Sequence, residues 1–161
     1  MGTEIISFLP SYLICIDNYN EYDIEGRLYW NRNMNGNIKF TDISQLLMKL
    51  EDIMENIQCP CAANEMRYFV ENKDNKNKTI SGVTRKETIK SMRDLDTHEE
   101  RGKKATFVLQ IKFRQNSSWQ GTVKWVEKKQ EINFRSALEL IKIIDSACEQ
   151  GYQAELVAQQ A

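Results

Sequence analysis

The chain has 161 residues, of which 41% are hydrophobic and 28% charged, as in an ordinary globular protein with room for a real core. Its formal net charge is -1, so no overall field draws it to nucleic acid or to an anionic membrane. No stretch is apolar for long enough to predict a membrane-spanning helix, and the N-terminus lacks the pattern of a signal peptide. We therefore expect a cytoplasmic protein with no membrane partner.

The first predicted unit, residues 12–55, has three strands followed by a helix. Residues 12–17 and 27–30 predict two strands, and Asn35-Gly36 predicts the hairpin turn that leads to the third. Asp42 followed by Gln45 predicts a helix N-cap with a side chain that reaches back. The helix has one apolar face, which we expect to lie in the core and which contains Leu46, Leu47, Leu50, Ile53 and Met54.

Residues 56–104 are predicted to be a connecting strand and a charged linker. Residues 64–70 alternate between apolar and polar side chains, which predicts a strand. Residues 72–78 contain no apolar side chain and predict a mobile loop, and residues 84–94 predict a short helix. We expect residues 72–104 to be the least ordered part of the chain and the first to be cleaved by a protease.

The second predicted unit, residues 105–150, repeats this pattern. Residues 107–114, 122–127 and 131–134 predict three strands, with a tight turn at Lys128-Lys129.

The helix of the second unit is predicted to begin after Ser136, which forms a capping box with Glu139. Its apolar face contains Leu140, Ile141, Ile144, Ala147 and Cys148. Gly151 resembles a helix C-cap, so residues 152–161 are predicted to be a tail that is either a short extra helix or frayed.

The two units align with each other. A shift of 95 positions pairs Ile16 with Ile111, Gly26 with Gly121 and Trp30 with Trp125, and a shift of 94 then pairs Phe40 with Phe134 and Leu46 with Leu140. We therefore predict an α+β fold with an internal duplication: two pseudo-symmetric βββα units, antiparallel sheet or sheets, and two packed helices. The alignment leaves open whether the units share one sheet.

The loop between the first two strands of the second unit is the predicted binding site. It and the next strand contain hydrogen-bonding, cationic and aromatic side chains: Arg114, Gln115, Asn116, Ser118, Trp119, Gln120, Lys124 and Trp125. These side chains suit a contact with a protein partner, a second copy of the chain or a small ligand. In the alternative interpretation, the polar groups bind the loop's own backbone and Trp119 covers the sheet, as turn residues and tryptophans commonly do.

The sequence predicts neither an enzyme nor a cofactor. It contains no nucleophile elbow, phosphate-binding loop or dinucleotide fingerprint, and His98 is its single histidine. Cys15 and Cys148 lie in apolar patterns and are expected to be buried. Cys59 and Cys61 follow the first helix, where they favour a structural turn, and a four-ligand zinc site would lack thiolates. We predict no catalytic and no metal-binding residues.

Two further functions stay open as alternatives. Residues 116–121 match the N-x-S-x-x-G part of the cyclic-dinucleotide motif of PilZ domains, although the R-x-x-x-R arm of that motif is missing. A nucleic-acid single strand could stack on the sheet, but the acidic loop at residues 18–25 would repel it. The candidates for such stacking and pairing are Tyr29, Trp30, Lys112, Arg114, Lys124 and Trp125.

The strings FRQN at residues 113–116, WQG at 119–121 and FRSALEL at 134–140 resemble a family of short proteins from clostridial-type gut bacteria. The CID strand that begins at Cys15 and the Leu46-Leu47 helix followed by Pro60 are similar to the upstream part of that family. The family has no assigned activity, so the resemblance implies kinship and no particular function. The sequence thus favours a non-enzymatic binding or adaptor module that contacts a protein partner or itself.

Overall fold

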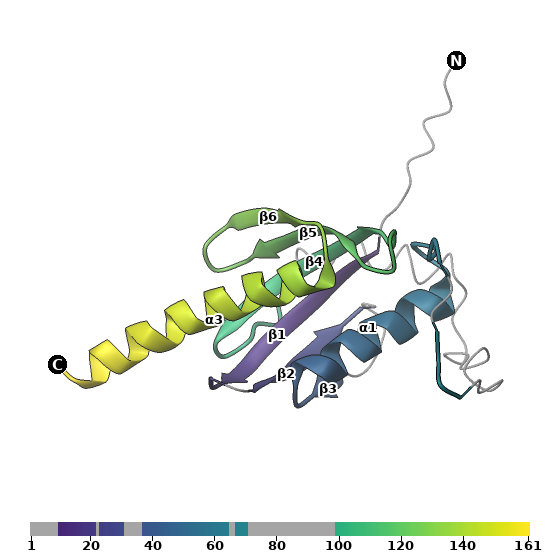
Figure 1. The fold of residues 1–161 in the computed structure, drawn as a ribbon. Coiled ribbons are helices and arrows are strands. Elements are labelled where there is room, and N and C mark those ends of the chain that lie inside the picture. Colours follow the sequence, from purple (N-terminus) through teal and green to yellow (C-terminus); the bar gives the residue numbers. More distant parts are fainter. Residues whose placement is uncertain (1–9, 22, 31–36, 65–66, 71–98) are drawn as a thin grey trace, which may run out of the picture.

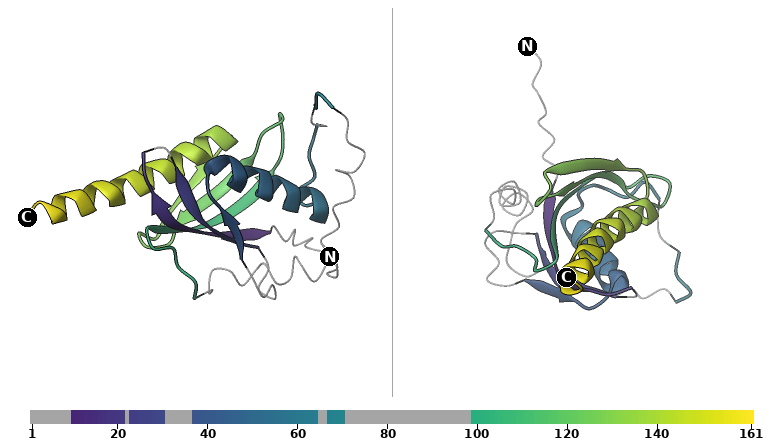
Figure 2. Two further views of the ribbon diagram at one scale, coloured as in Figure 1. Left: turned by 90° about the horizontal axis from the view of Figure 1, so that it is seen from below. Right: turned by 90° about the vertical axis from the view of Figure 1, so that its left-hand side faces the viewer.

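The structure, a computed structural model, describes residues 10–21, 23–30, 37–64, 67–70 and 99–161. One six-stranded antiparallel sheet in the order β3-β2-β1-β4-β5-β6 curves around two helices (Figures 1 and 2). The elements are β1 (Ser11–Tyr19), β2 (Ile24–Tyr29), β3 (Ile38–Phe40), α1 (Ile43–Ile57), β4 (Ala105–Phe113), β5 (Gln120–Trp125), β6 (Gln130–Phe134) and α3 (Ala137–Gln159). The predicted α+β class is therefore confirmed, and all six strands lie in one sheet.

The centre of the sheet is the antiparallel pair of β1 and β4. Tyr12 lies opposite Leu109, and Ile14 lies opposite Phe107. A shift of 95 positions carries Tyr12 to Phe107 and Ile14 to Leu109, so this register is unchanged when the two strands exchange places. The strands on either side of the centre also follow in mirrored order.

Gly26 and Gly121 occupy matching positions beside these central strands. Gly26 of β2 lies opposite Ile16, and Gly121 of β5 lies opposite Ile111; a β-bulge in the central strand follows each isoleucine. A Cβ atom on Gly26 would lie 2.0 Å from the carbonyl oxygen of the residue before Ile16, and one on Gly121 would lie 1.9 Å from the oxygen before Ile111. Both positions therefore need glycine because the backbones approach too closely for a side chain.

The main core fills the concave side of the sheet, between the strands and the two helices. Strand residues that alternate along the chain point into it, as the period of two predicts. Its fully buried large side chains include Tyr12, Ile14, Trp30, Phe40, Phe107, Phe134, Leu46 and Leu50. The convex side, called the outer face below, has a smaller buried cluster of Leu13, Cys15 and Val108.

Both helix starts have the predicted capping chemistry. The Asp42 carboxylate accepts a hydrogen bond from the Gln45 amide at 2.8 Å, and the Ser136 hydroxyl accepts one from the Glu139 amide at 3.1 Å. The Glu139 carboxylate reaches back one residue beyond the cap and accepts the Arg135 amide at 2.8 Å. The local sequence therefore fixes where each helix begins.

The prediction that α3 ends at Gly151 is wrong. The helix continues through Gly151 for two more turns and extends beyond the sheet (Figure 1). Tyr152 packs edge-on against Tyr19 with 6.1 Å between ring centroids, and Glu155 forms an ion pair with Lys104 at 2.6 Å. These tertiary contacts stabilise the extra turns and outweigh the local preference of glycine for a helix end.

We expect Gly151→Ala to raise the free energy of unfolding by about 0.5–1 kcal/mol, because alanine loses less backbone entropy in a helix interior. A Cβ atom at this position would meet nothing within 4 Å, so no clash offsets the gain. Urea denaturation measures the change. A variant that is less stable than the parent would show that α3 does not run through this residue.

Four other predicted segments are either wrong or lie outside the described residues. The strand predicted at 64–70 is wrong for the described residues 67–70, which lie outside any strand. The turn at 35–36, the loop at 72–78 and the helix at 84–94 lie outside the described residues.

Candidate functional site

Arg114, the first residue of the predicted binding loop, is buried and ion-paired. It follows β4 and is only 4% exposed. Its guanidinium Nη2 donates to the carboxylates of Glu51 and Glu55, which lie one turn apart on α1. Its Nη1 donates to the Pro60 carbonyl oxygen at 3.1 Å. Arg114 therefore ties the end of the central strand to α1 and to the segment that follows α1.

Trp119 takes part in the same cluster. Its side chain is 8% exposed, and its indole Nε1 donates to Glu51 Oε2 at 3.0 Å, while Glu51 Oε1 accepts from Arg114. A hollow of about 40 Å³ lies beside these side chains. That volume holds a few water molecules, whereas pockets for drug-sized ligands span roughly 300–1,000 Å³. The hollow is therefore too small for a cyclic dinucleotide.

The rest of the loop largely satisfies its own polar groups. The Gln115 amide donates to Gln120 Oε1 at 3.1 Å, and Gln120 Nε2 donates back to the Gln115 carbonyl at 3.0 Å. The Ser118 hydroxyl accepts the Ala137 amide at 3.0 Å, at the first residue of α3. Asn116 remains exposed at the tip, in the left-handed region with φ 54°.

Lys124 and Trp125 lie on opposite faces of β5. Lys124 is on the outer face, opposite Glu131 of β6. Trp125 is on the concave side, where its ring lies 6.3 Å from that of Phe107 and the Lys128 ammonium lies 5.8 Å from its centre. The eight predicted residues therefore do not form one surface.

The burial of Arg114 and Trp119 contradicts their prediction as exposed anchors, because both bind groups of the same chain. The alternative interpretation, in which the loop binds its own backbone and Trp119 is a packing residue, describes the structure. The residues proposed to bind a nucleic-acid single strand do not lie together on one face of the sheet either. Trp30 and Arg114 are buried and Trp125 faces the helices, which leaves Tyr29 as the one aromatic of that set on the outer face.

The acidic partners of the loop were not predicted from the sequence. Glu51 and Glu55 lie on α1, the helix whose apolar face we assigned to the core. Their spacing of four residues, which places both side chains on one side of the helix, is the sequence pattern that could have identified them. The alignment held a second signal. It pairs Arg114 with Tyr19 and Glu51 with Asp145, and the Tyr19 hydroxyl donates to Asp145 Oδ1 at 2.9 Å. The end of each central strand thus bonds to an acidic residue on the helix of the other half.

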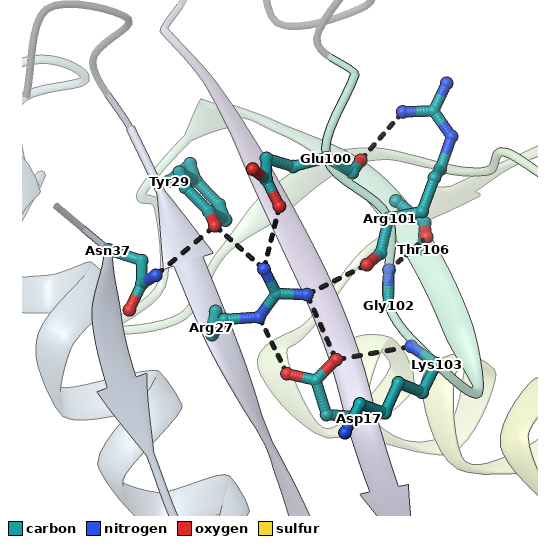
Figure 3. A network of polar contacts seen from close by, with 9 residues as sticks. All are labelled: Asp17, Arg27, Tyr29, Asn37, Glu100, Arg101, Gly102, Lys103 and Thr106. Carbon is teal, nitrogen blue, oxygen red and sulfur yellow. Dashed lines mark hydrogen bonds and ion pairs between the residues drawn. The ribbon is translucent and has the colours of Figure 1, made fainter. Parts of the chain in front are cut away.

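A second polar cluster lies on the outer face around Arg27 (Figure 3). Arg27 binds both carboxylate oxygens of Asp17, at 2.7 and 3.1 Å, and Glu100 at 2.9 Å. It also donates to the Tyr29 hydroxyl at 2.9 Å and to the Arg101 carbonyl at 2.8 Å. This network holds the chain that enters β4 against β1 and β2.

Asp17→Asn is expected to lower the free energy of unfolding at pH 7 by about 1–2 kcal/mol. Burial alone would raise the pKa of Asp17, but hydrogen bonds from Arg27 and from the Lys103 amide outweigh it and hold this pKa below its ordinary value. A depressed pKa gives stability that is present above about pH 4 and is lost as the pH falls through the folded value. In urea titrations from pH 7 to pH 3, the free energies of unfolding of Asp17→Asn and wild type should therefore become more similar as the pH falls. A difference that does not change with pH would contradict this.

No disulfide joins the four cysteines, and their exposure differs. Burial raises the pKa of Cys15 and of Cys148 to about 12, so neither forms a thiolate near neutral pH. Cys61 is exposed, and Cys59 is half-buried. We expect Ellman's reagent to modify Cys61 first, Cys59 second, and the other two cysteines only after denaturation. A fast reaction of Cys15 or Cys148 in the native protein would contradict their burial.

Within the described ranges, no three His, Cys, Asp or Glu side chains gather closely enough to hold a metal ion. No helix in that part of the chain has the length and apolar character needed to cross a membrane. No family model, curated protein or solved structure matches this chain. The resemblance to the clostridial-type family therefore stays a prediction.

Proposed function

We propose that this chain is a non-enzymatic cytoplasmic binding module that contacts a protein partner through the open edge of its sheet. The observation that carries the proposal is β6, the last strand of the sheet (Figure 1). Its first four residues, Gln130 to Asn133, are all exposed, and its far edge has no strand partner among the described residues. Such an edge is a template for pairing with an extended segment of another chain.

The loop tip supports the same surface. Gln120 Nε2 donates to the Arg135 carbonyl at 3.3 Å, just after β6, and Ser118 binds the first residue of α3. The loop that contains Asn116 is therefore tied to the chain that follows β6. We define the edge surface as residues 130–133 together with Asn116. Peptide groups, amides and one isoleucine suit a polypeptide better than a nucleotide or a nucleic-acid single strand.

Arg114 and Trp119 have a supporting role in this proposal. They fasten the loop to α1 and so hold the edge surface in a fixed position, and they do not touch the partner. A preformed surface loses little entropy on binding.

We further propose that the fold arose by internal duplication of a βββα unit. The mirrored strand order, the self-matching register of β1 and β4, and the equivalent close approaches at Gly26 and Gly121 support this. The acidic contacts of Tyr19 and Arg114 support it as well. Separate expression of residues 1–70 and 99–161, followed by mixing, tests whether the two halves assemble.

Photo-cross-linking tests the proposed function. A photoreactive amino acid at Asn133 should cross-link to a protein in cells that make this chain. The same residue at Met48, which is 65% exposed on α1, is the control and should not give that product. Equal cross-linking at both positions, or none at Asn133, would refute binding through the β6 edge.

A further inference from the structure

The direction of the hydrogen bonds in β5 determines which peptide groups β6 presents to solvent. The Val126 amide donates to the Thr106 carbonyl of β4 at 2.9 Å. In an antiparallel sheet, the peptide groups of successive residues point to opposite neighbours. Trp125, Val123 and Gly121 of β5 therefore bond to β6, where they lie opposite Gln130, Ile132 and Phe134.

It follows that Glu131 and Asn133 direct their peptide N–H and C=O groups away from the sheet. These are the outward-facing peptide groups in the interior of β6. A strand that pairs with this edge must bond to both residues, and their spacing of two is the repeat of an antiparallel ladder.

A second copy of β6 meets this requirement. If two β6 strands run antiparallel with Ile132 on the two-fold axis, Glu131 of each copy lies opposite Asn133 of the other. Both residues point outward, so two pairs of backbone hydrogen bonds form. Ile132 then faces Ile132 of the second copy in a non-hydrogen-bonded position, where Cα atoms lie about 4.5 Å apart and side chains make contact.

The neighbouring two-fold registers are less favourable. Centring the axis on Glu131 places two like charges directly opposite each other, which destabilises a strand pair. Centring it on Asn133 requires the Arg135 peptide group to bond across the interface. The Arg135 amide already donates to Glu139 at 2.8 Å, and its carbonyl accepts from Gln120 at 3.3 Å. An axis between two residues would place outward-facing groups opposite inward-facing ones.

The side chains of β6 fit this arrangement. Ile132 is 49% exposed, so pairing removes apolar surface from water. The strand pairs with β5 without a bulge and contains no proline, so it lacks two common features that block edge pairing. Lys129 and Arg135 lie opposite each other across the axis, and their repulsion is screened by salt.

We propose that the occupant of the β6 edge is a second copy of this chain, paired antiparallel about Ile132 to form a continuous twelve-stranded sheet. The inference rests on the proposed function and names its partner. A five-residue strand gives a small interface, so the dimer is weak and its population depends on concentration and rises with salt.

Sedimentation equilibrium of the purified full chain, from micromolar to near-millimolar concentration, tests the dimer. Asn133→Pro removes one outward N–H from each copy and leaves the bonds to β5 intact, and edge strands tolerate proline at such positions. We expect this variant to weaken dimerisation about tenfold or more. Met48→Lys, a change of an exposed apolar residue on α1, should alter it less than about twofold.

A cysteine cross-link tests the register. In a Cys59→Ser/Cys61→Ser background, Ile132→Cys should oxidise to a disulfide-linked dimer, because the two Cα atoms fall within bonding range. Gln130→Cys is the control and should not form a disulfide-linked dimer, since the cysteine of each copy would lie opposite Phe134 of the other copy. A chain that stays monomeric at all concentrations would overturn the inference. A dimer whose dissociation constant is unchanged by Asn133→Pro would overturn it as well. If the purified chain is monomeric but Asn133 cross-links to a different protein in cells, the proposed function stands and this inference fails.

Discussion

Arg114→Met is expected to lower the free energy of unfolding by about 3 kcal/mol, because removing one partner of a buried ion pair leaves the other charge uncompensated. The loss is smaller than for a fully buried pair, since Glu51 and Glu55 are 23% and 54% exposed and keep some solvation. For a chain of this length, the melting temperature should fall by roughly 6–12 °C. Urea denaturation and calorimetry measure the two quantities.

Arg135→Met provides a matched control for this prediction. Arg135 also pairs with a glutamate, Glu139 at 3.4 Å, but its side chain is 88% exposed. Exposed pairs contribute little, so this variant should lose less than about 0.5 kcal/mol. A double-mutant cycle of Arg114→Met with Glu51→Gln should show coupling of about 1 kcal/mol or more. Equal losses for the two arginine variants would mean that Arg114 does not tie the loop to α1.

Gly26→Ala and Gly121→Ala are each expected to lower the free energy of unfolding by about 3 kcal/mol. The added methyl would lie 2.0 or 1.9 Å from a backbone carbonyl oxygen of the neighbouring central strand, so the strands must separate locally. The two variants should lose similar amounts, because the two close approaches are equivalent. Chemical denaturation of both proteins tests this, with Gly151→Ala as the control for a glycine that no backbone approaches. Retention of wild-type stability in either variant would contradict the close approach at that position.

The features that the sequence predicted correctly depend on neighbouring residues. Asp42 and Ser136 cap their helices through groups three residues away, so the chemistry is visible in a short stretch of sequence. The strands of the second unit alternate between apolar and polar residues for the same local reason. The alignment of Gly26 with Gly121 also predicted a tertiary feature, because both glycines lie where the backbone of a central strand approaches closely.

The features that were not predicted from the sequence depend on contacts between residues that are distant along the chain. Arg114 looks like a loop residue within its own segment, and its partners Glu51 and Glu55 lie 63 and 59 positions earlier. Gly151 looks like a helix end, but Tyr152 gains a contact with Tyr19 that only the folded sheet provides. In both cases tertiary packing outweighed the local signal.

The pairing of β1 with β4 has a consequence for synthesis on the ribosome. Paired residues of these strands are about 90 to 100 positions apart, so β1 emerges roughly 5 to 20 s before its central partner. Until then the strand has one open edge, and Leu13 and Val108 cannot yet cover each other. A nascent chain in this state exposes apolar surface beside unpaired peptide groups, which is the combination that promotes aggregation and chaperone binding. A strand that is paired on both sides in the finished sheet thus has an open edge while the rest of the chain is being made.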